Sequence, residues 1–341
     1  MLCREEGNFQ LASTYAQEAQ ALFREAADTR GETWVHMVVG EISRGYGAYY
    51  EALGHFELAL TSFQSLRDKE GYAAALRNRG TIGEALGQYT KALNDYDEAL
   101  RIFNELDLRT GQAWVLADRG VVYADQGNSA LAEKSCTESI AIFREQGIRR
   151  GEGWALRAMG EALWERRDVV QARICYSESA SIFRAIGDRV DLARVLNTQG
   201  AIAFEEKEFL AAKDLFEQAQ SIAHDYGARQ IEGRALRGLA DVARVLQRFS
   251  EAERLYQDAM IIAVELDTPA ERCAVLRRLG VLHQTRGNHQ DALSFWVQAL
   301  ALDQRLGHQA RSDLQQKVDA LVTEHDLQQA YAASCSQYGL L

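Results

Sequence analysis

Small and large apolar residues return along this chain at a fixed spacing of forty residues. Counting in forties from Ala12 meets an alanine eight times. A usually bulky position follows four residues after each alanine, and a small one follows three residues later. Residues four and seven apart lie on one face of an α-helix, so each unit is predicted to contain an amphipathic helix. The alanines are Ala12, Ala52, Ala92, Ala132, Ala172, Ala212, Ala252 and Ala292, and the bulky series is Ala16, Phe56, Tyr96, Cys136, Tyr176, Phe216, Tyr256 and Trp296.

Two glycine series divide the unit further. A glycine inside a helix costs about 1 kcal/mol relative to alanine, so a recurrent one indicates that another helix backbone approaches too closely for a side chain. The second series suits a turn, because glycine readily adopts the left-handed conformation. The helical series is Gly40, Gly80, Gly120, Gly160, Gly200, Ala240 and Gly280, and the turn series is Gly7, Gly47, Gly87, Gly127 and Gly287. Arg167, Lys207 and Gln247 interrupt the turn series, where we expect strained or differently capped turns.

Each unit is therefore predicted to be a pair of antiparallel helices, for example residues 111–126 and 129–146, with the second helix the longer. Neither helix can bury its apolar face alone, so successive pairs should stack into a solenoid with a continuous core. Phenylalanine recurs late in the second helix and is the expected contact between units. These residues are Phe23, Phe63, Phe103, Phe143 and Phe183.

The order of residues within one unit resembles the tetratricopeptide repeat. The residues that carry the resemblance are Leu76, Gly80, Gly87, Ala92, Tyr96 and Ala99. The pattern covers residues 1 to about 306, but its unit is about six residues longer than the common form, whose late proline is missing. This long form looks like the arrays of bacterial signal-transduction ATPases and large transcriptional regulators. The resemblance implies an all-α fold, a right-handed superhelical solenoid of antiparallel helix pairs.

The forty-residue spacing also predicts how the chain is divided. Residues 1–28 are expected to form a truncated first repeat, since Met1 falls inside a first helix, as in a fragment of a longer array. Residues 31–306 should form seven full repeats. The more polar residues 307–341 are expected to form C-terminal capping helices, at 309–323 and 325–336, whose outer face meets water.

Composition narrows the functional classes. The net charge is −11, which argues against nucleic acid or an anionic membrane as a partner. The five cysteines are widely spaced without a CxxC pair, which favours reduced thiols in the cytoplasm. The N-terminal segment does not resemble a signal peptide, and no apolar run is long enough to span a membrane.

Motifs for chemistry are missing from the sequence. There is no GxxxxGK[ST] phosphate loop, no HExxH and no Cys/His spacing typical of a metal site. We therefore expect no catalytic residues, no metal and no cofactor, and a protein that is not an enzyme. The ATPase that the resemblance suggests would lie outside this chain.

A binding surface remains, and the resemblance implies that it is the concave side, which the first helix of each repeat lines. Arginine presents donors matched to carboxylate or phosphate, tryptophan offers a rigid apolar platform, and asparagine can bind a peptide amide. Residues forty apart occupy equivalent positions in successive repeats, and we call such a set a column. Several columns of the first helices place arginines and aromatic residues on this side. The candidate binding residues are Arg77, Asn78, Trp114, Trp154, Arg157, Trp164, Arg194, Asn197, Phe204, Arg234, Arg237 and Arg277. The strongest local prediction is a wall of Arg157, Arg194, Asn197, Arg234 and Arg237 beside Trp154, Trp164 and Phe204.

Two functional hypotheses stay open at this stage. In the first, the chain is the sensor or interaction scaffold of a larger bacterial signalling protein, binding a protein, an acidic peptide or a small anionic effector. In the second, it is a structural spacer that self-associates through its N-terminal half-repeat. Acidic residues of neighbouring repeats, such as Asp118, Asp125, Glu161, Glu165 and Asp241, would then neutralise the arginines.

Overall fold

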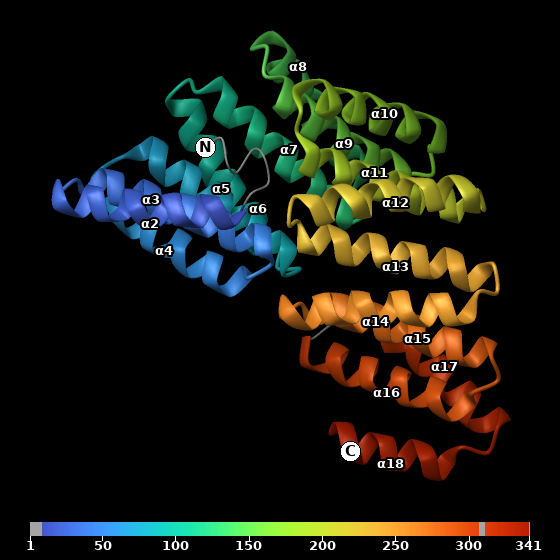
Figure 1. The fold of residues 1–341 in the computed structure, drawn as a ribbon. Coiled ribbons are helices and arrows are strands. Elements are labelled where there is room, and N and C mark those ends of the chain that lie inside the picture. The colour runs from blue at the N-terminus through green and yellow to red at the C-terminus, as the bar shows by residue number, and fades with distance from the viewer. Residues whose placement is uncertain (1–8, 307–310, 341) are drawn as a thin grey trace. The chain divides into compact units, whose positions relative to one another are not determined.

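A computed structural model describes residues 9–306 and 311–340 (Figure 1). All regular structure in these residues is α-helical, which confirms the predicted fold class. The chain divides into two compact units, a division that the repeat pattern did not predict. The first unit comprises the residues up to Gln199 together with Asp225–Ala228, and the second comprises Gly200–His224 and the residues from Arg229 onward.

Helix starts follow the forty-residue spacing without exception from α3 to α16. The first helices of the repeats are α3 (Thr29–Tyr46), α5 (Lys69–Ala85), α7 (Arg109–Asp125), α9 (Arg149–Glu165), α11 (Arg189–Glu205), α13 (Arg229–Val245) and α15 (Pro269–Thr285). The second helices are α4 (Tyr49–Ser65), α6 (Tyr89–Glu105), α8 (Ser129–Glu145), α10 (Val169–Ile186), α12 (Phe209–Asp225), α14 (Phe249–Glu265) and α16 (His289–Leu306). Most helices of both kinds have 17 residues, so the expectation of a longer second helix was wrong.

Three further helices lie at the two ends. They are α2 (Phe9–Glu25), α17 (Arg311–Glu324) and α18 (Gln328–Tyr338). The last two occupy the region where capping helices were expected, although residues 309 and 310 of that prediction lie outside the described residues. Both pack against α16. The start of the predicted first repeat, residues 1–8, also lies outside the description.

Residues in the left-handed conformation, with positive φ, occur both in turns within a repeat and in turns between repeats. Arg167, Lys207 and Gln247 have φ values of 63°, 65° and 60°, so a non-glycine side chain adopts the glycine conformation. This confirms the prediction that these turns are strained. After the turn that follows α4, Asp68 Oδ1 accepts a hydrogen bond of 2.9 Å from the backbone N–H of Gly71 and caps α5.

The forty-spaced alanines occupy equivalent buried positions, from Ala12 to Ala292. The glycine series faces the bulky series: a Cβ placed on Gly80 would lie 2.5 Å from Cε1 of Tyr96, and one on Gly160 would lie 2.8 Å from Cζ of Tyr176. We predicted a neighbouring helix backbone at these glycines. The structure corrects this, because the close atoms belong mainly to the bulky side chain of the paired helix.

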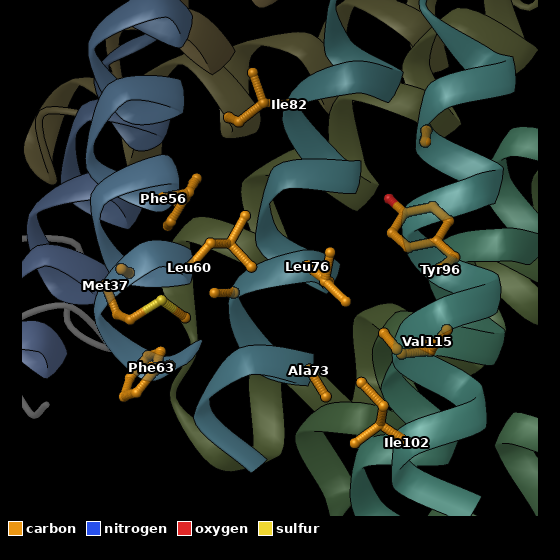
Figure 2. Close-up of a cluster of buried hydrophobic side chains, with 14 of the residues drawn as sticks. Met37, Phe56, Leu60, Phe63, Ala73, Leu76, Ile82, Tyr96, Ile102 and Val115 are labelled. Carbon is orange, nitrogen blue, oxygen red and sulfur yellow. The ribbon is translucent and has the colours of Figure 1, made fainter. Parts of the chain in front are cut away.

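The expected phenylalanines pack between repeats. Phe63 is fully buried, and its ring lies where a Cβ of Gly71, on the next first helix, would be 2.5 Å away. Around it the side chains of α3 to α7 form one apolar cluster, which Figure 2 shows from Met37 to Val115. Because each such cluster contains residues of more than one repeat, every helix pair depends on its neighbour for burial.

Candidate binding surface on the first helices

A large cavity lies in the first unit, on the face formed by α3, α5 and α7. Its volume is about 1110 Å³. We call it the first-helix pocket. Its lining includes Trp34, Met37, Val38, Glu41, Glu70, Ala74, Arg77, Asn78, Asp107, Arg109 and Trp114, and α2 adds Tyr15 and Phe23. Three predicted site residues, Arg77, Asn78 and Trp114, meet here.

Apolar side chains form much of this pocket. Trp34 and Val38 are each 38% exposed and present apolar surface to the pocket. Trp34 packs edge-on against Phe63 with a centroid distance of 5.2 Å, and Trp114 packs in the same way against Phe143 at 4.9 Å. Both indole rings are therefore held by the core while they line the pocket.

Two polar side chains of the pocket, Arg77 and Asn78, are bound to neighbouring repeats. Arg77 Nε donates to Asp118 Oδ2 at 2.5 Å, and its guanidinium lies 4.8 Å from the centre of the Trp114 ring. Burial alone would lower the pKa of Arg77, but the Asp118 carboxylate raises it overall. Asn78 Nδ2 donates to Glu41 Oε1 at 3.0 Å. The arginine is thus charged and already paired with a carboxylate.

A second cluster in the first unit surrounds Trp154. Its indole N–H donates to Asp191 Oδ2 at 2.9 Å, and the guanidinium groups of Arg157 and Arg194 lie 4.5 Å and 5.9 Å from its ring centre. Arg157 is buried and forms an ion pair with Glu161. Trp154 is therefore engaged by neighbouring side chains.

Glu84 has the most perturbed carboxyl group of the first-helix face. Burial, with the nearby carboxylates Asp118 and Asp125, raises the pKa of Glu84 to about 8. At neutral pH this side chain is mostly protonated, and the hydroxyl of Tyr96 lies 3.4 Å from its Oε2. The sequence pattern gave no sign of this altered charge.

In the second unit, two arginines of α13 share one carboxylate of α15. Arg234 Nε and Arg237 Nη1 both donate to Glu271, at 2.7 Å and 2.5 Å. Arg278 Nε donates to Asp241 Oδ2 at 2.7 Å. Burial acts to raise the pKa of Glu271, but the two arginines lower it overall.

The remaining predicted residues are placed as follows. Arg277 forms an ion pair with Asp303, whose other oxygen accepts from Cys273. Trp164 has the guanidinium of Arg167 at 5.9 Å from its ring centre, Phe204 packs against Phe209 at 5.6 Å, and Asn197 is half-buried.

The proposed wall is split between the two units. Arg157, Arg194 and Asn197 belong to the first, and Arg234 and Arg237 to the second.

Sequence reasoning missed several pocket residues. Trp34 and Met37 lie in the predicted columns but were not selected, although a tryptophan in the same column as Trp114 was a usable signal. Val38 and Glu41 follow one and four residues after Met37 on the same helix. The contribution of α2, through Tyr15, had no signal, because α2 was expected only as the second helix of a repeat.

Two further properties concern the described residues only. No group of three or more histidine, cysteine or acidic side chains among them could hold a metal ion. None of the helices in residues 9–306 and 311–340 is long and apolar enough to cross a membrane.

Comparison with known proteins agrees with the repeat pattern. The tetratricopeptide repeat family model matches residues 39–105, 71–145, 151–225 and 231–305. The chain therefore belongs to the tetratricopeptide repeat family. No curated protein matches its sequence.

Solved structures share the fold at low sequence identity. A Rap protein complexed with competence and sporulation factor is 12% identical, with a TM-score of 0.61, over 93% of this chain and 98% of that one. The apo quorum sensor NprR from B. thuringiensis is 14% identical, with a TM-score of 0.55, over 93% and 98%. A signal-transduction ATPase with a tetratricopeptide repeat sensor from Pyrococcus horikoshii is 12% identical, with a TM-score of 0.60, over 96% of this chain and 55% of that one.

Proposed function

We propose that this chain is a non-catalytic scaffold that binds a peptide or an extended segment of a partner protein in the first-helix pocket. The observation that carries the proposal is the pocket itself, about 1110 Å³ in volume and lined by two partly exposed indoles, Trp34 and Trp114. Aromatic residues held rigidly at a concave surface are typical anchors for binding.

The geometry fits an extended segment because three successive first helices contribute to one cavity. Apolar side chains of the ligand would contact Trp34 and Val38 from α3 and Trp114 from α7. Asn78, between them on α5, is held by Glu41 at 3.0 Å. A fixed amide is suited to hydrogen bonding with a peptide backbone.

We further propose that the chain is the sensor or interaction region of a larger bacterial signalling protein and works in the cytoplasm. Proteins of the same fold support this by analogy: one is titled a complex with competence and sporulation factor, one a quorum sensor, and one a signalling ATPase with a repeat sensor. Fold alone does not choose a ligand.

The predicted acidic or small anionic partner is kept as a proposal for the second unit. There Arg234 and Arg237 share the carboxylate of Glu271, and Arg278 contacts Asp241. Guanidinium groups gathered in this way present donors suited to a carboxylate or phosphate of a ligand.

The alternative function is a structural or self-associating spacer. It is favoured by the ion pairs between repeats, such as Arg77 with Asp118, which use inner-face charges for stability. In this case the pocket has no ligand, and self-association through the N-terminal region is measurable by light scattering over a range of concentrations.

Selection from a random peptide display library separates the two functions. We expect sequences enriched on the wild-type chain to bind the double variant Trp34→Ala/Val38→Gln at least about tenfold more weakly, because both side chains line the pocket. Val170→Gln is the matched control, since Val170 is an exposed valine of α10 outside the pocket. Absence of any enriched sequence, or equal binding to all three proteins, would reject the proposed function in favour of the spacer.

A further inference from the structure

The charges at the first-helix pocket differ from those that the arginine-rich sequence columns suggest. Arg77 is paired with Asp118 at 2.5 Å and lies against Trp114. Arg109, the other arginine of the pocket, has Glu145 at 3.6 Å and donates to Gln112 at 3.2 Å. Both positive charges therefore have a partner of this chain, and neither requires an anionic ligand.

Two carboxylates at the same pocket lack such partners. Glu70 lies in the first turn of α5, and Asp107 lies in the turn between α6 and α7 with φ at 52°. Both side chains are exposed, both line the pocket, and neither forms an ion pair with a described residue. The uncompensated charge at this pocket is thus negative.

Apolar and acidic groups occur together at one cavity. The apolar part consists of Trp34, Met37, Val38 and Trp114, and the acidic part of Glu70 and Asp107. Complementarity of charge selects partners and orients them, while burial of apolar side chains supplies most of the affinity. A ligand that satisfies both parts carries a bulky apolar side chain and a nearby positive charge.

We infer that the occupant of the first-helix pocket is a basic, apolar peptide segment, in which a large hydrophobic side chain packs on Trp34 and Trp114 while a lysine, arginine or amino terminus pairs with Glu70 and Asp107. This inference rests on the proposed function and specifies its ligand class. It is the reverse of the acidic partner that the arginine columns suggested, which concerns the second unit instead.

The test uses the peptides selected from the random library on the full chain. We expect the enriched sequences to combine aromatic or large aliphatic residues with a net positive charge. Binding of the best sequence is then measured by the fluorescence of the protein's tryptophans or by calorimetry. Glutamine in place of its lysines and arginines should weaken binding about 3- to 30-fold, since exposed ion pairs contribute modestly.

The variant Glu70→Gln/Asp107→Asn removes both carboxylates while keeping side-chain size. Asparagine is well tolerated at positive φ, so the turn at residue 107 should persist. We expect it to weaken the basic peptide about 3- to 30-fold and to flatten the dependence of binding on salt. The matched control is Glu98→Gln/Glu138→Gln, which removes two exposed carboxylates of α6 and α8 outside the pocket and should leave binding within about twofold.

The outcomes separate the two proposals. Enriched peptides that depend on Trp34 and Val38 but are neutral or acidic, or that bind the Glu70/Asp107 variant unchanged, would overturn the inference and leave the peptide-binding function standing. Equal weakening by the control pair would show a general effect of net charge and also overturn it. A library that yields no peptide dependent on Trp34 and Val38 rejects the proposed function, and the inference with it.

Discussion

Replacing Gly80 by alanine tests the packing on which every repeat depends. In an exposed helix interior this change stabilises, because alanine has the higher helix propensity by about 1 kcal/mol. At Gly80 the new Cβ would lie 2.5 Å from Cε1 and 2.8 Å from Cδ1 of Tyr96. Tyr96 is fully buried between α5 and α6, so its ring has little space to move.

The expected magnitude follows from two opposing terms. Forcing one extra carbon into a packed core costs about 1–3 kcal/mol, and the gain in helix propensity offsets about 1 kcal/mol of it. We therefore expect Gly80→Ala to destabilise the chain by up to about 2 kcal/mol. Gly54→Ala is the matched control, because a Cβ on Gly54 in α4 meets nothing within 4 Å; it should stabilise by up to about 1 kcal/mol.

Urea unfolding followed by circular dichroism at 222 nm measures both changes as shifts of the midpoint, in opposite directions. A double-mutant cycle with Tyr96→Ala identifies the cause, since Gly80→Ala should become stabilising once the ring is removed. If Gly80→Ala stabilises the otherwise native chain as much as Gly54→Ala does, the ring does not rest on the glycine, and our account of the small and large positions is wrong.

Three further predictions concern a carboxyl group, a turn and the thiols. The raised pKa of Glu84 means that the folded state binds the proton more tightly than the unfolded state, so its contribution to stability falls as pH rises from about 4.5 to about 8. Relative to wild type, the free energy of unfolding of Glu84→Gln should therefore rise over this pH range by on the order of 1 kcal/mol or more. Urea unfolding at pH 5 and pH 8.5 measures this difference. The same difference between the two proteins at both pH values would contradict the raised pKa of Glu84. Gln247→Gly should raise the free energy of unfolding by about 0.5–1 kcal/mol, because φ is 60° there, and a lowered melting temperature would refute the reasoning. Burial raises the pKa of Cys136 to about 12 and that of the half-buried Cys175 to about 11, so alkylation of the folded protein, mapped by mass spectrometry, should modify Cys175 before Cys136.

The repeat could be predicted from sequence because it rests on positions that cannot change independently. Ala92 and the equivalent alanines of the other repeats are buried, and a larger residue would not fit at these positions. The forty-residue spacing can therefore be recognised in the sequence. Helix boundaries near 111–126 and 129–146 came within two residues of the observed Arg109–Asp125 and Ser129–Glu145. The prediction of a helix backbone next to Gly80 was wrong, because a glycine indicates that another atom lies close but does not identify that atom.

The surface was less predictable, because its chemistry depends on pairs of residues in different repeats. Arg77 and Trp114, which the columns placed on the inner face, line one pocket together with Asn78. The sequence named Asp118 as one of several acids that could neutralise arginines, but not Arg77 as its partner, since that contact depends on side-chain direction as well as on helix position. The charge of the pocket therefore emerged only from the structure.

The contact between Arg77 and Asp118 limits how such an array can change by gain or loss of repeats. The cores are interchangeable: deleting forty residues, for instance 109–148, would bring alanines, glycines and rings back into register. The ion pair is not interchangeable. After this deletion Ala158, forty positions after Asp118, would take the place of Asp118 and leave Arg77 without its carboxylate. Shuffling of whole repeats would thus preserve the architecture while rewriting the electrostatic character of the binding face, so that specificity diverges faster than fold.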